Sequence, residues 1–309
     1  MRLYVGITDR AWFDHLAGLV PEEVNYWRPR AQGTFRALSP GELFLFKLHS
    51  PLNYIVGGGI FAHYTRVPLS LAWELFGPAN GAPDLGTLRR RIGALGASRE
   101  LDPPIGCIIL SSPFILSQAE WIPAPASWHA SIQQGKTYST EDGEGRLLWV
   151  QLQDRLQRLH MAEEQVSIHQ LADPGVRYGA LLIHEPRLGQ GGFRARVTDA
   201  YDRRCALTGE RVLPVLEAAH IRDHAESGPN SVSNGLLLRA DLHNLFDRGY
   251  LTVTTDLRIE VSQGIHEEFN NGREYLRLHG QPLVQVPRAA VERPSPEFLR
   301  WHNENRYRG

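Results

Sequence analysis

Residues 217–250 read EAAHIRDHAESGPNSVSNGLLLRADLHNLFDRGY, and this stretch decides the fold of the second half of the chain. The apolar run VLPVLEAAHI predicts a strand that ends at His220. A turn at Gly228–Pro229 follows, and NGLLL predicts a second short strand that opens at Asn234. RADLHNLFDRG then has helical spacing, and Gly249 predicts the end of that helix. The unit is therefore strand, loop, strand, helix.

The polar residues of this unit suggest a catalytic site. His243 and Asp247 are four positions apart on the predicted helix, so they share one face and can hold a divalent ion. A neutral His220 at the facing strand end can take a proton from an attacking water. The amide of Asn234 can brace the loop that aims His220. A lone strand histidine most often belongs to the core, but this ordered set of His, Asn, His and an acid favours a site.

The segments CALTGERVLPVLEAAHI and NGLLLRADLHNLFDRGYLTV resemble the HNH nuclease family, in the branch with an AAHI…NGL.L…H..FD.G signature. The resemblance implies a ββα-metal fold that cleaves DNA phosphodiesters with Mg²⁺ or Mn²⁺. Residue by residue, it implies that His220 is the general base, Asn234 the orienting asparagine and His243 a metal ligand. Asp247 is expected as a second ligand from its place on the helix.

Two departures from the family pattern concern the metal. Many members carry Asp or His just before the base, where this chain has Ala219, with Glu217 two positions earlier. Water, Asp247 or Glu217 could replace that ligand. Many members also have paired CxxC knuckles, but here only Cys205 stands where one would begin. One thiolate cannot make a four-ligand site, so no structural zinc is expected.

The first half predicts a small mixed sheet that forms a barrel, with helices inserted between strands. Within it, FRALSPGELFLFKLHSPLNYIVGGGIFAHYT (35–65) resembles the PUA-like superfamily, which includes SRA, EVE and ASCH domains. The shared features are the PGE turn before a strand and the glycines at 57–59, which allow a sharp bend or a close ligand.

Domains of this kind often hold one extruded base between aromatic rings, where a methyl or hydroxymethyl mark can be read. The candidate walls of such a pocket are Tyr26, Trp27, Phe46, Tyr54 and Trp73. The alternative for each of them is an ordinary core aromatic.

The expected organisation is α+β in three parts. Residues 1–150 form a PUA-like β-barrel reader domain, 151–179 a linker helix and joint around Pro174–Gly175, and 180–309 a ββα-metal HNH domain with a C-terminal strap. A length of 309 residues agrees with about two domains. Phe193, Val197 and Tyr201 form one apolar helix stripe ahead of the HNH motif, which indicates packing.

The composition of the chain bears on whether the protein spans a membrane, is secreted or carries a strong overall charge. No apolar run approaches the roughly 20 residues of a membrane span, and MRLYVGITDR lacks the layout of a signal peptide. Only Cys107 and Cys205 are present, which suggests a reducing bacterial cytoplasm. The net charge of −1 gives no global basic field.

Arginine far outnumbers lysine, since only Lys47 and Lys136 are lysine among 33 basic residues. Biased genome composition explains this as well as phosphate binding does. The arginines expected to contact DNA are Arg187, Arg194, Arg222 and Arg248.

The layout resembles modification-dependent restriction endonucleases. We therefore expect an endonuclease that recognises a modified cytosine in double-stranded DNA through its first domain and cuts with a single-metal HNH site, and we favour a homodimer. One rival is a non-catalytic reader of modified DNA with a degenerate HNH scaffold, which Ala219 would favour. Another is an RNA-directed PUA-like protein with a nuclease tail.

Overall fold

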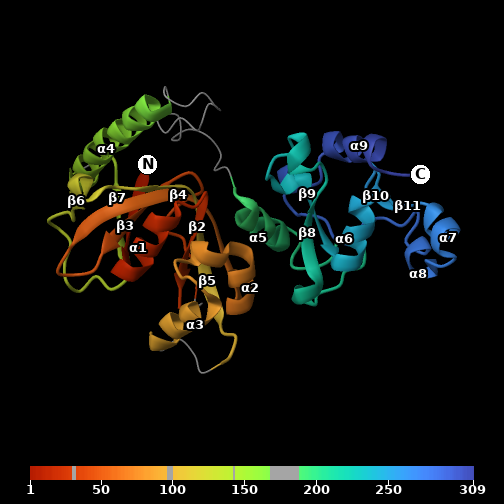
Figure 1. The fold of residues 1–309 in the computed structure, drawn as a ribbon, viewed down its shortest axis with the longest axis horizontal. Helices are drawn as coiled ribbons and strands as arrows, with labels where there is room; N and C mark the ends of the chain where they lie inside the picture. Colours follow the sequence, from red (N-terminus) through yellow and green to blue (C-terminus); the bar gives the residue numbers. More distant parts are fainter. Residues whose placement is uncertain (30–32, 96–99, 142, 168–187) are drawn as a thin grey trace. The chain divides into compact units, whose positions relative to one another are not determined.

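The computed structural model describes residues 1–29, 33–95, 100–141, 143–167 and 188–309. The chain divides into two compact units, Met1–Arg187 and Leu188–Gly309, each with mixed α and β structure (Figure 1). The expected joint at Pro174–Gly175 lies outside the described residues. No described helix is long and apolar enough to span a bilayer.

The first unit consists of one large sheet with helices around it. Its elements are β1 (Arg2–Thr8), α1 (Arg10–Leu19), β2 (Glu23–Arg28), β3 (Leu43–Leu48), β4 (Tyr54–Pro68), α2 (Leu69–Phe76), η1 (Gly77–Asn80), α3 (Leu85–Ala94), β5 (Pro104–Ile115), η2 (Gln118–Glu120), β6 (Ile122–Pro123), β7 (Gly135–Ser139) and α4 (Gly143–Ser167).

The strand order is β2-β5-β4-β3-β1-β7, with β6 paired to β4. β1 and β3 are parallel and the other neighbours are antiparallel. Among the described strands β2 and β7 are the two ends of this path, so the expected closed barrel is not formed. Side chains of β2 reach across instead: the Tyr26 hydroxyl donates to the Ile7 carbonyl of β1, and Arg28 Nη2 donates at 2.8 Å to Oε1 of Gln134, the residue before β7.

β3 is the centre of the first unit, because all six of its residues are buried. Alternation along a strand sends neighbouring side chains to opposite faces. Phe44 and Phe46 pack in one cluster with Trp12 of α1, whereas Leu43 and Leu45 pack in a second cluster on the other face. This arrangement explains the apolar run LFLF at 43–46.

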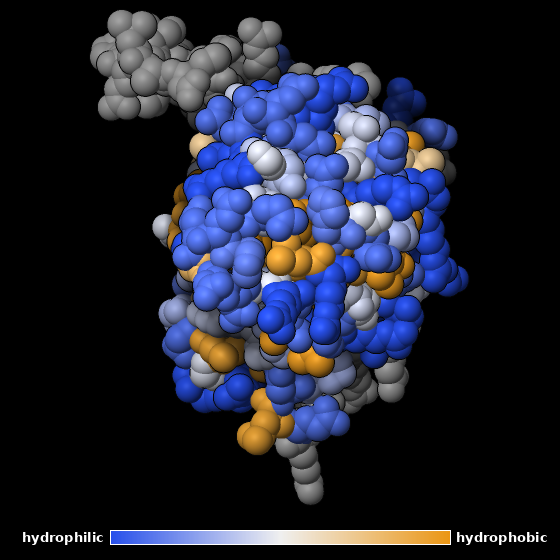
Figure 2. All heavy atoms as spheres, turned by 90° about the vertical axis from the view of Figure 1, so that its right-hand side faces the viewer, coloured by the Kyte–Doolittle hydropathy of each residue, from blue (hydrophilic) through white to orange (hydrophobic). Residues whose placement is uncertain are grey.

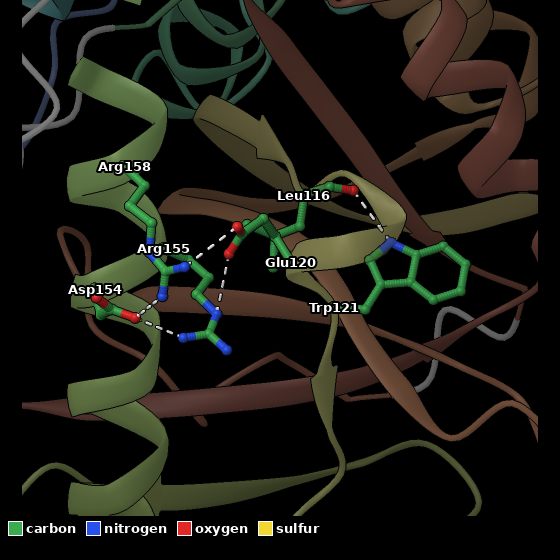
Figure 3. Close-up of polar contacts among 6 residues, drawn as sticks. All are labelled: Leu116, Glu120, Trp121, Asp154, Arg155 and Arg158. Carbon is green, nitrogen blue, oxygen red and sulfur yellow. Dashed lines mark hydrogen bonds and ion pairs between the residues drawn. The ribbon is translucent and has the colours of Figure 1, made fainter. Parts of the chain in front are cut away.

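α4 begins before the expected linker helix and packs on the sheet. Leu148 and Leu152 are 3% and 0% exposed and join the core cluster of Leu43 and Leu45. Figure 3 shows Arg155 and Arg158 reaching Glu120 of η2, at 3.2 and 3.5 Å. The first turns of α4 therefore belong to the first unit and do not lead away from it.

The second unit is built around the strand, loop, strand and helix that the sequence predicts. Its elements are α5 (Gln190–Ala200), η4 (Leu213–Val215), β8 (Leu216–His220), η5 (His224–Glu226), η6 (Val232–Asn234), β9 (Gly235–Arg239), α6 (Ala240–Asp247), β10 (Leu251–Val253), β11 (Ile259–Val261), α7 (Gly264–Phe269), α8 (Arg273–Leu276), η7 (Ala290–Glu292) and α9 (Pro296–Asn305). Figure 2 shows the face of the molecule that lies on the right-hand side of Figure 1. This face is mostly hydrophilic, and its apolar side chains lie in small separate areas.

β8 and β9 form an antiparallel hairpin that pairs His220 with Gly235. α5 and α6 both pack on this hairpin. The α5 stripe of Phe193, Val197 and Tyr201 is fully buried, as its spacing predicts. Gly235 permits the close approach of α5, because a Cβ there would lie 2.6 Å from Val197 Cγ2.

α9 is fastened to the core through a buried histidine. The His302 ring stacks on Phe246 at 3.7 Å, contacts Thr252 Oγ1 at 2.8 Å through Nδ1, and contacts the Phe246 carbonyl at 3.2 Å through Nε2. Burial lowers the pKa of His302 from 6.5 to about 4. The imidazole is therefore neutral in the folded chain at neutral pH.

This burial predicts a pH-dependent stability. In the unfolded chain His302 binds a proton below about pH 6.5, whereas in the folded chain it does so only below about pH 4. Its contribution is thus complete above pH 6.5 and is lost as the pH falls toward 4. At about 1.4 kcal/mol per pKa unit the loss amounts to a few kcal/mol.

His302→Gln removes this titration, so between pH 7 and pH 4.5 the variant should lose less stability than the wild type. Urea unfolding of both proteins at the two pH values measures the difference. Equal losses would contradict the role of His302.

Candidate functional site

His220 ends β8 and is held by an aromatic ring and an amide. Its ring lies flat on Phe193 of α5, with centroids 3.9 Å apart and 12° between the planes. Its Nε2 lies 2.8 Å from Asn230 Oδ1. Stacking fixes the plane of the imidazole, and the hydrogen bond fixes its rotation within that plane.

Asn230 also determines which ring nitrogen of His220 carries the proton. Its Nδ2 donates to the Leu188 carbonyl at 2.8 Å, so its Oδ1 faces His220 as an acceptor. His220 Nε2 must therefore be the protonated nitrogen. A neutral imidazole then has its lone pair on Nδ1, which makes Nδ1 the basic atom. Sequence reasoning missed Asn230; its place four residues before Asn234 was the only signal.

Asn234 closes the loop between β8 and β9 from inside. It is completely buried. Its Oδ1 accepts from Arg222 N at 2.9 Å, and its Nδ2 donates to the carbonyls of Arg222 and Pro229 at 2.9 and 3.0 Å. One side chain thus satisfies backbone groups on both sides of the loop that follows His220, as the sequence predicts for a bracing asparagine.

His243 lies on α6 between two carboxylates. Its Nδ1 is 2.6 Å from Glu217 Oε2 on β8, and its Nε2 is 3.3 Å from Asp247 Oδ2 one turn later. The short contact with Glu217 selects the neutral tautomer that carries its proton on Nδ1, and in that tautomer Nε2 is the atom available to a metal. Burial raises the pKa of the Asp247 carboxyl group, and the nearby Asp223 and Glu217 carboxylates raise it further, while His243 and Arg306 oppose the shift.

The donor atoms of His243 and Asp247 fit a divalent ion. Neighbouring ligands of an octahedral Mg²⁺ at about 2.1 Å are about 3 Å apart, close to the 3.3 Å between Nε2 and Oδ2. A carboxylate on the other nitrogen is the usual way that a metal-binding histidine is oriented. Within the described chain no three His, Cys, Asp or Glu side chains converge as a ready-made metal site. The fit is therefore to an ion with two protein ligands and otherwise water or phosphate oxygens.

Comparison with known families identifies this segment. Residues 205–254 match the family model described as HNH endonuclease. The second unit thus carries an HNH endonuclease motif. A search of curated proteins finds no match to the chain.

Two solved structures are similar to parts of the chain. One is a modification-dependent TagI restriction endonuclease, with 23% identity, a TM-score of 0.27 and coverage of 38% of each chain. The other is a mutant form of an ASCH protein from Zymomonas mobilis, with 9% identity, a TM-score of 0.32 and coverage of 48% of this chain and 94% of that one. The chain thus spans well under half of the TagI enzyme that it matches.

Position 219, which precedes the HNH histidine, cannot supply a ligand. Ala219 is completely buried in the core of the unit. The acidic groups near His243 come instead from Glu217 and Asp247, which were the alternatives open from the sequence.

Three of the arginines expected to contact DNA lie in the HNH unit. Arg248 is exposed directly after α6, beside Asp247. The side chain of Arg222 donates to the Glu226 carbonyl at 2.8 Å and lies over Trp301. Arg194 lies on α5, and Arg187 lies outside the described residues.

The first unit contains an aromatic cavity of about 630 Å³. This volume is within the usual range of ligand pockets, roughly 300–1,000 Å³. Tyr4, Trp12, Tyr26 and Trp27 line it together with polar groups that include Asp9, Arg28 and Gln134. The indole nitrogens of Trp12 and Trp27 both donate to the Asn80 carbonyl, at 3.1 and 2.9 Å, which fixes these two rings.

Only part of the expected aromatic set lines this cavity. Tyr26 and Trp27 do so. Phe46 is fully buried in the core, Trp73 packs beside α3, and Tyr54 lines a different cavity. Tyr4 and Trp12 were missed because strand and helix periodicity marks them as core residues.

Asn234→Ala should destabilise the chain, because partly buried backbone groups of Arg222 and Pro229 would lose their partner. An unsatisfied buried group costs about 1–3 kcal/mol, and these groups are only partly buried, so we expect a loss of about 1–2 kcal/mol. Asn244→Ala is the matched control, since Asn244 is exposed and donates only to the Ala240 carbonyl of its own helix. Urea unfolding should show a change below about 0.5 kcal/mol for the control. Similar losses for both variants would refute the bracing role.

Proposed function

We propose that this chain is a divalent-metal-dependent DNA endonuclease of the modification-dependent type. The HNH unit hydrolyses the DNA backbone, and the first unit recognises a modified cytosine. One HNH site cuts one strand, so a double-strand break requires two protomers or two events. The observation that carries the nuclease assignment is the HNH match together with His243, held between Glu217 and Asp247.

The geometry of the HNH unit supports a separate role for each residue of the site. Nδ1 of His220 takes the proton of the attacking water, because Nε2 is already protonated toward Asn230. Asn234 holds the loop that aims His220. Glu217 holds Nδ1 of His243 and so orients the ring with Nε2 toward Asp247, where His243 and Asp247 would hold Mg²⁺ or Mn²⁺. When bound, the ion supplies Lewis-acid stabilisation of the charge on the phosphate and the departing oxygen.

The aromatic cavity supports a base-recognition role for the first unit. An extruded base offers two flat faces and a polar edge. Tyr4, Trp12, Tyr26 and Trp27 supply aromatic surface, while Asp9 and Gln134 supply polar groups for the edge. A modified cytosine is the ligand that we propose for this cavity.

The rival function is a reader of modified DNA that does not cut. Ala219 favours it, because the ligand that many HNH enzymes carry at that position is missing. Nicking of methylated and unmethylated plasmid, with Mg²⁺ or with chelator, separates the two. Metal-dependent nicking supports the nuclease, and binding without nicking supports the reader.

His220→Ala should lower the rate of DNA cleavage by at least about 10²-fold, the usual contribution of a general base. DNA affinity should stay the same, because the imidazole acts on water and not on DNA binding. Single-turnover cleavage and fluorescence anisotropy in chelator measure the two quantities. Near-normal cleavage would remove His220 as the base.

Asn230→Ala serves as a graded companion to His220→Ala. It leaves the imidazole in place but removes the acceptor that fixes its tautomer, so cleavage should fall by less than in His220→Ala. Long-range ¹H–¹⁵N spectra should show Nε2–H alone for His220 in the wild type and a mixture of tautomers in the variant. An unchanged tautomer in the variant would contradict the role of Asn230.

A second prediction concerns the modified base. The wild type should bind a duplex with one 5-methylcytosine more tightly than the unmodified duplex by at least about 1 kcal/mol, the value of one good base contact. Trp27→Ala should remove this preference. Trp73→Ala, an equal loss of ring area away from the cavity, should keep it. Anisotropy at one fixed salt concentration decides between these outcomes. A preference that survives Trp27→Ala would exclude this cavity.

A further inference from the structure

Lys47 of β3 is a buried cation in the first unit. Its side chain is 1% exposed. The ammonium group donates to the Leu48 carbonyl at 2.9 Å and to Asn53 Oδ1 at 2.8 Å, and it lies 4.8 Å from the centre of the Trp128 ring. Every one of these contacts is neutral, so the contacts described for Lys47 include no carboxylate.

Lys136, the other lysine of the chain, has a different environment. It is partly exposed on β7 and donates to Ser127 Oγ at 2.7 Å. The Glu144 carboxylate accepts from the same serine, and the pKa of Glu144 is lowered chiefly by the hydrogen bonds from Ser127 and further by the charge of Lys136. Lys136 therefore has both solvent and a nearby negative charge, whereas the described contacts of Lys47 provide neither.

Lys47 lines a second cavity of about 530 Å³. The exposed residues His49, Ser50 and Asn53 form part of its wall and add groups that can donate hydrogen bonds. This cavity adjoins the aromatic cavity, because Ile7 and His49 line both. A single ligand with an aromatic part and an anionic part could therefore occupy the two cavities together.

The charge of Lys47 is costly where it lies. Moving an ammonium group out of water is unfavourable unless an anion or a full set of acceptors replaces the water. Burial accordingly lowers the pKa of Lys47. Carbonyl dipoles and an aromatic face offset part of this cost, and an anion in the cavity would offset much more of it.

We propose that the cavity lined by Lys47 is a phosphate-binding site, which takes a backbone phosphate of the DNA strand whose base enters the aromatic cavity. The nucleotide assignment rests on the proposed function of the first unit, whereas the anion site itself rests on Lys47 and its cavity. Phosphate fits better than an isolated carboxylate, because the shared wall at Ile7 and His49 joins this site to an aromatic one. A phosphodiester and free inorganic phosphate share this chemistry.

The two lysines permit a direct test on the unaltered protein. Lysine labelled with ¹³C at Cε gives one set of signals from Lys47 and one from Lys136, and Lys136→Gln assigns them. The full chain is titrated in chelator with inorganic phosphate, with deoxycytidine 5′-monophosphate, with deoxycytidine and with duplex DNA. The Lys47 signal should move with each phosphate-containing probe, while Lys136 stays unchanged. Deoxycytidine alone should leave Lys47 nearly unaffected.

Movement with duplex DNA and the monophosphate as well as with inorganic phosphate supports a nucleotide phosphate as the ligand. Movement with inorganic phosphate alone overturns the DNA assignment, and no movement with any probe overturns the site. These outcomes do not depend on whether the aromatic cavity distinguishes modified bases. If the protein binds methylated and unmethylated duplexes equally but duplex DNA still shifts the Lys47 signal, only the proposed recognition of a modified base fails.

Lys47→Gln gives a second readout in solution. Loss of one phosphate contact should lower the affinity for methylated and unmethylated duplexes by the same factor. It should also reduce the slope of log affinity against log salt concentration by about one. Lys136→Gln is the control and should keep the wild-type slope. An unchanged slope for Lys47→Gln, with the fold verified by circular dichroism, would overturn the proposal.

Discussion

The second unit depends on one buried amide. Asn234 binds backbone groups of Arg222 and Pro229, so the loop between β8 and β9 is held by the side chain of the residue just before β9. Without that amide these partly buried backbone groups would lose their hydrogen-bond partner, which is unfavourable. His220 directly precedes this loop and Asn230 lies within it, so the contact between their side chains depends on the same closure.

The side chains around this hairpin leave each histidine with one defined basic nitrogen. Asn230 accepts from Nε2 of His220, and Glu217 contacts Nδ1 of His243. The two rings thus present opposite nitrogens, Nδ1 in His220 and Nε2 in His243. A base and a metal ligand both need an unprotonated nitrogen at a fixed position, so this arrangement suits both roles.

Much of the second unit could be predicted because its signals are local. A strand that ends at His220, the NGLLL strand and the helix with His243 and Asp247 follow from periodicity over short windows. The contacts of Asn230 and Glu217 could not be predicted, because they join residues 10 and 26 positions apart.

The same limit explains the errors in the first unit. Edge closure of a sheet depends on strand curvature, which sequence periodicity does not encode, so the expected barrel is an open sheet with side chains between its ends. Phe46 was expected in the base pocket and Trp12 was not, because both are large apolar side chains that the sequence does not distinguish. The positions of β3 and α1 in the fold place Trp12, and not Phe46, at the cavity. α4 resembled a solvated linker because its exposed face is rich in Gln, Glu and Arg, although Leu148 and Leu152 bury the other face.

The central claim is that a divalent ion binds at the end of α6 beside the HNH hairpin. Crystals soaked in Mn²⁺ and measured at the manganese absorption edge test it most directly. The account predicts one anomalous peak within about 2.2 Å of both His243 Nε2 and Asp247 Oδ2, with oxygen ligands completing the shell. A peak at any other group of residues, or none at saturating Mn²⁺, would contradict the account.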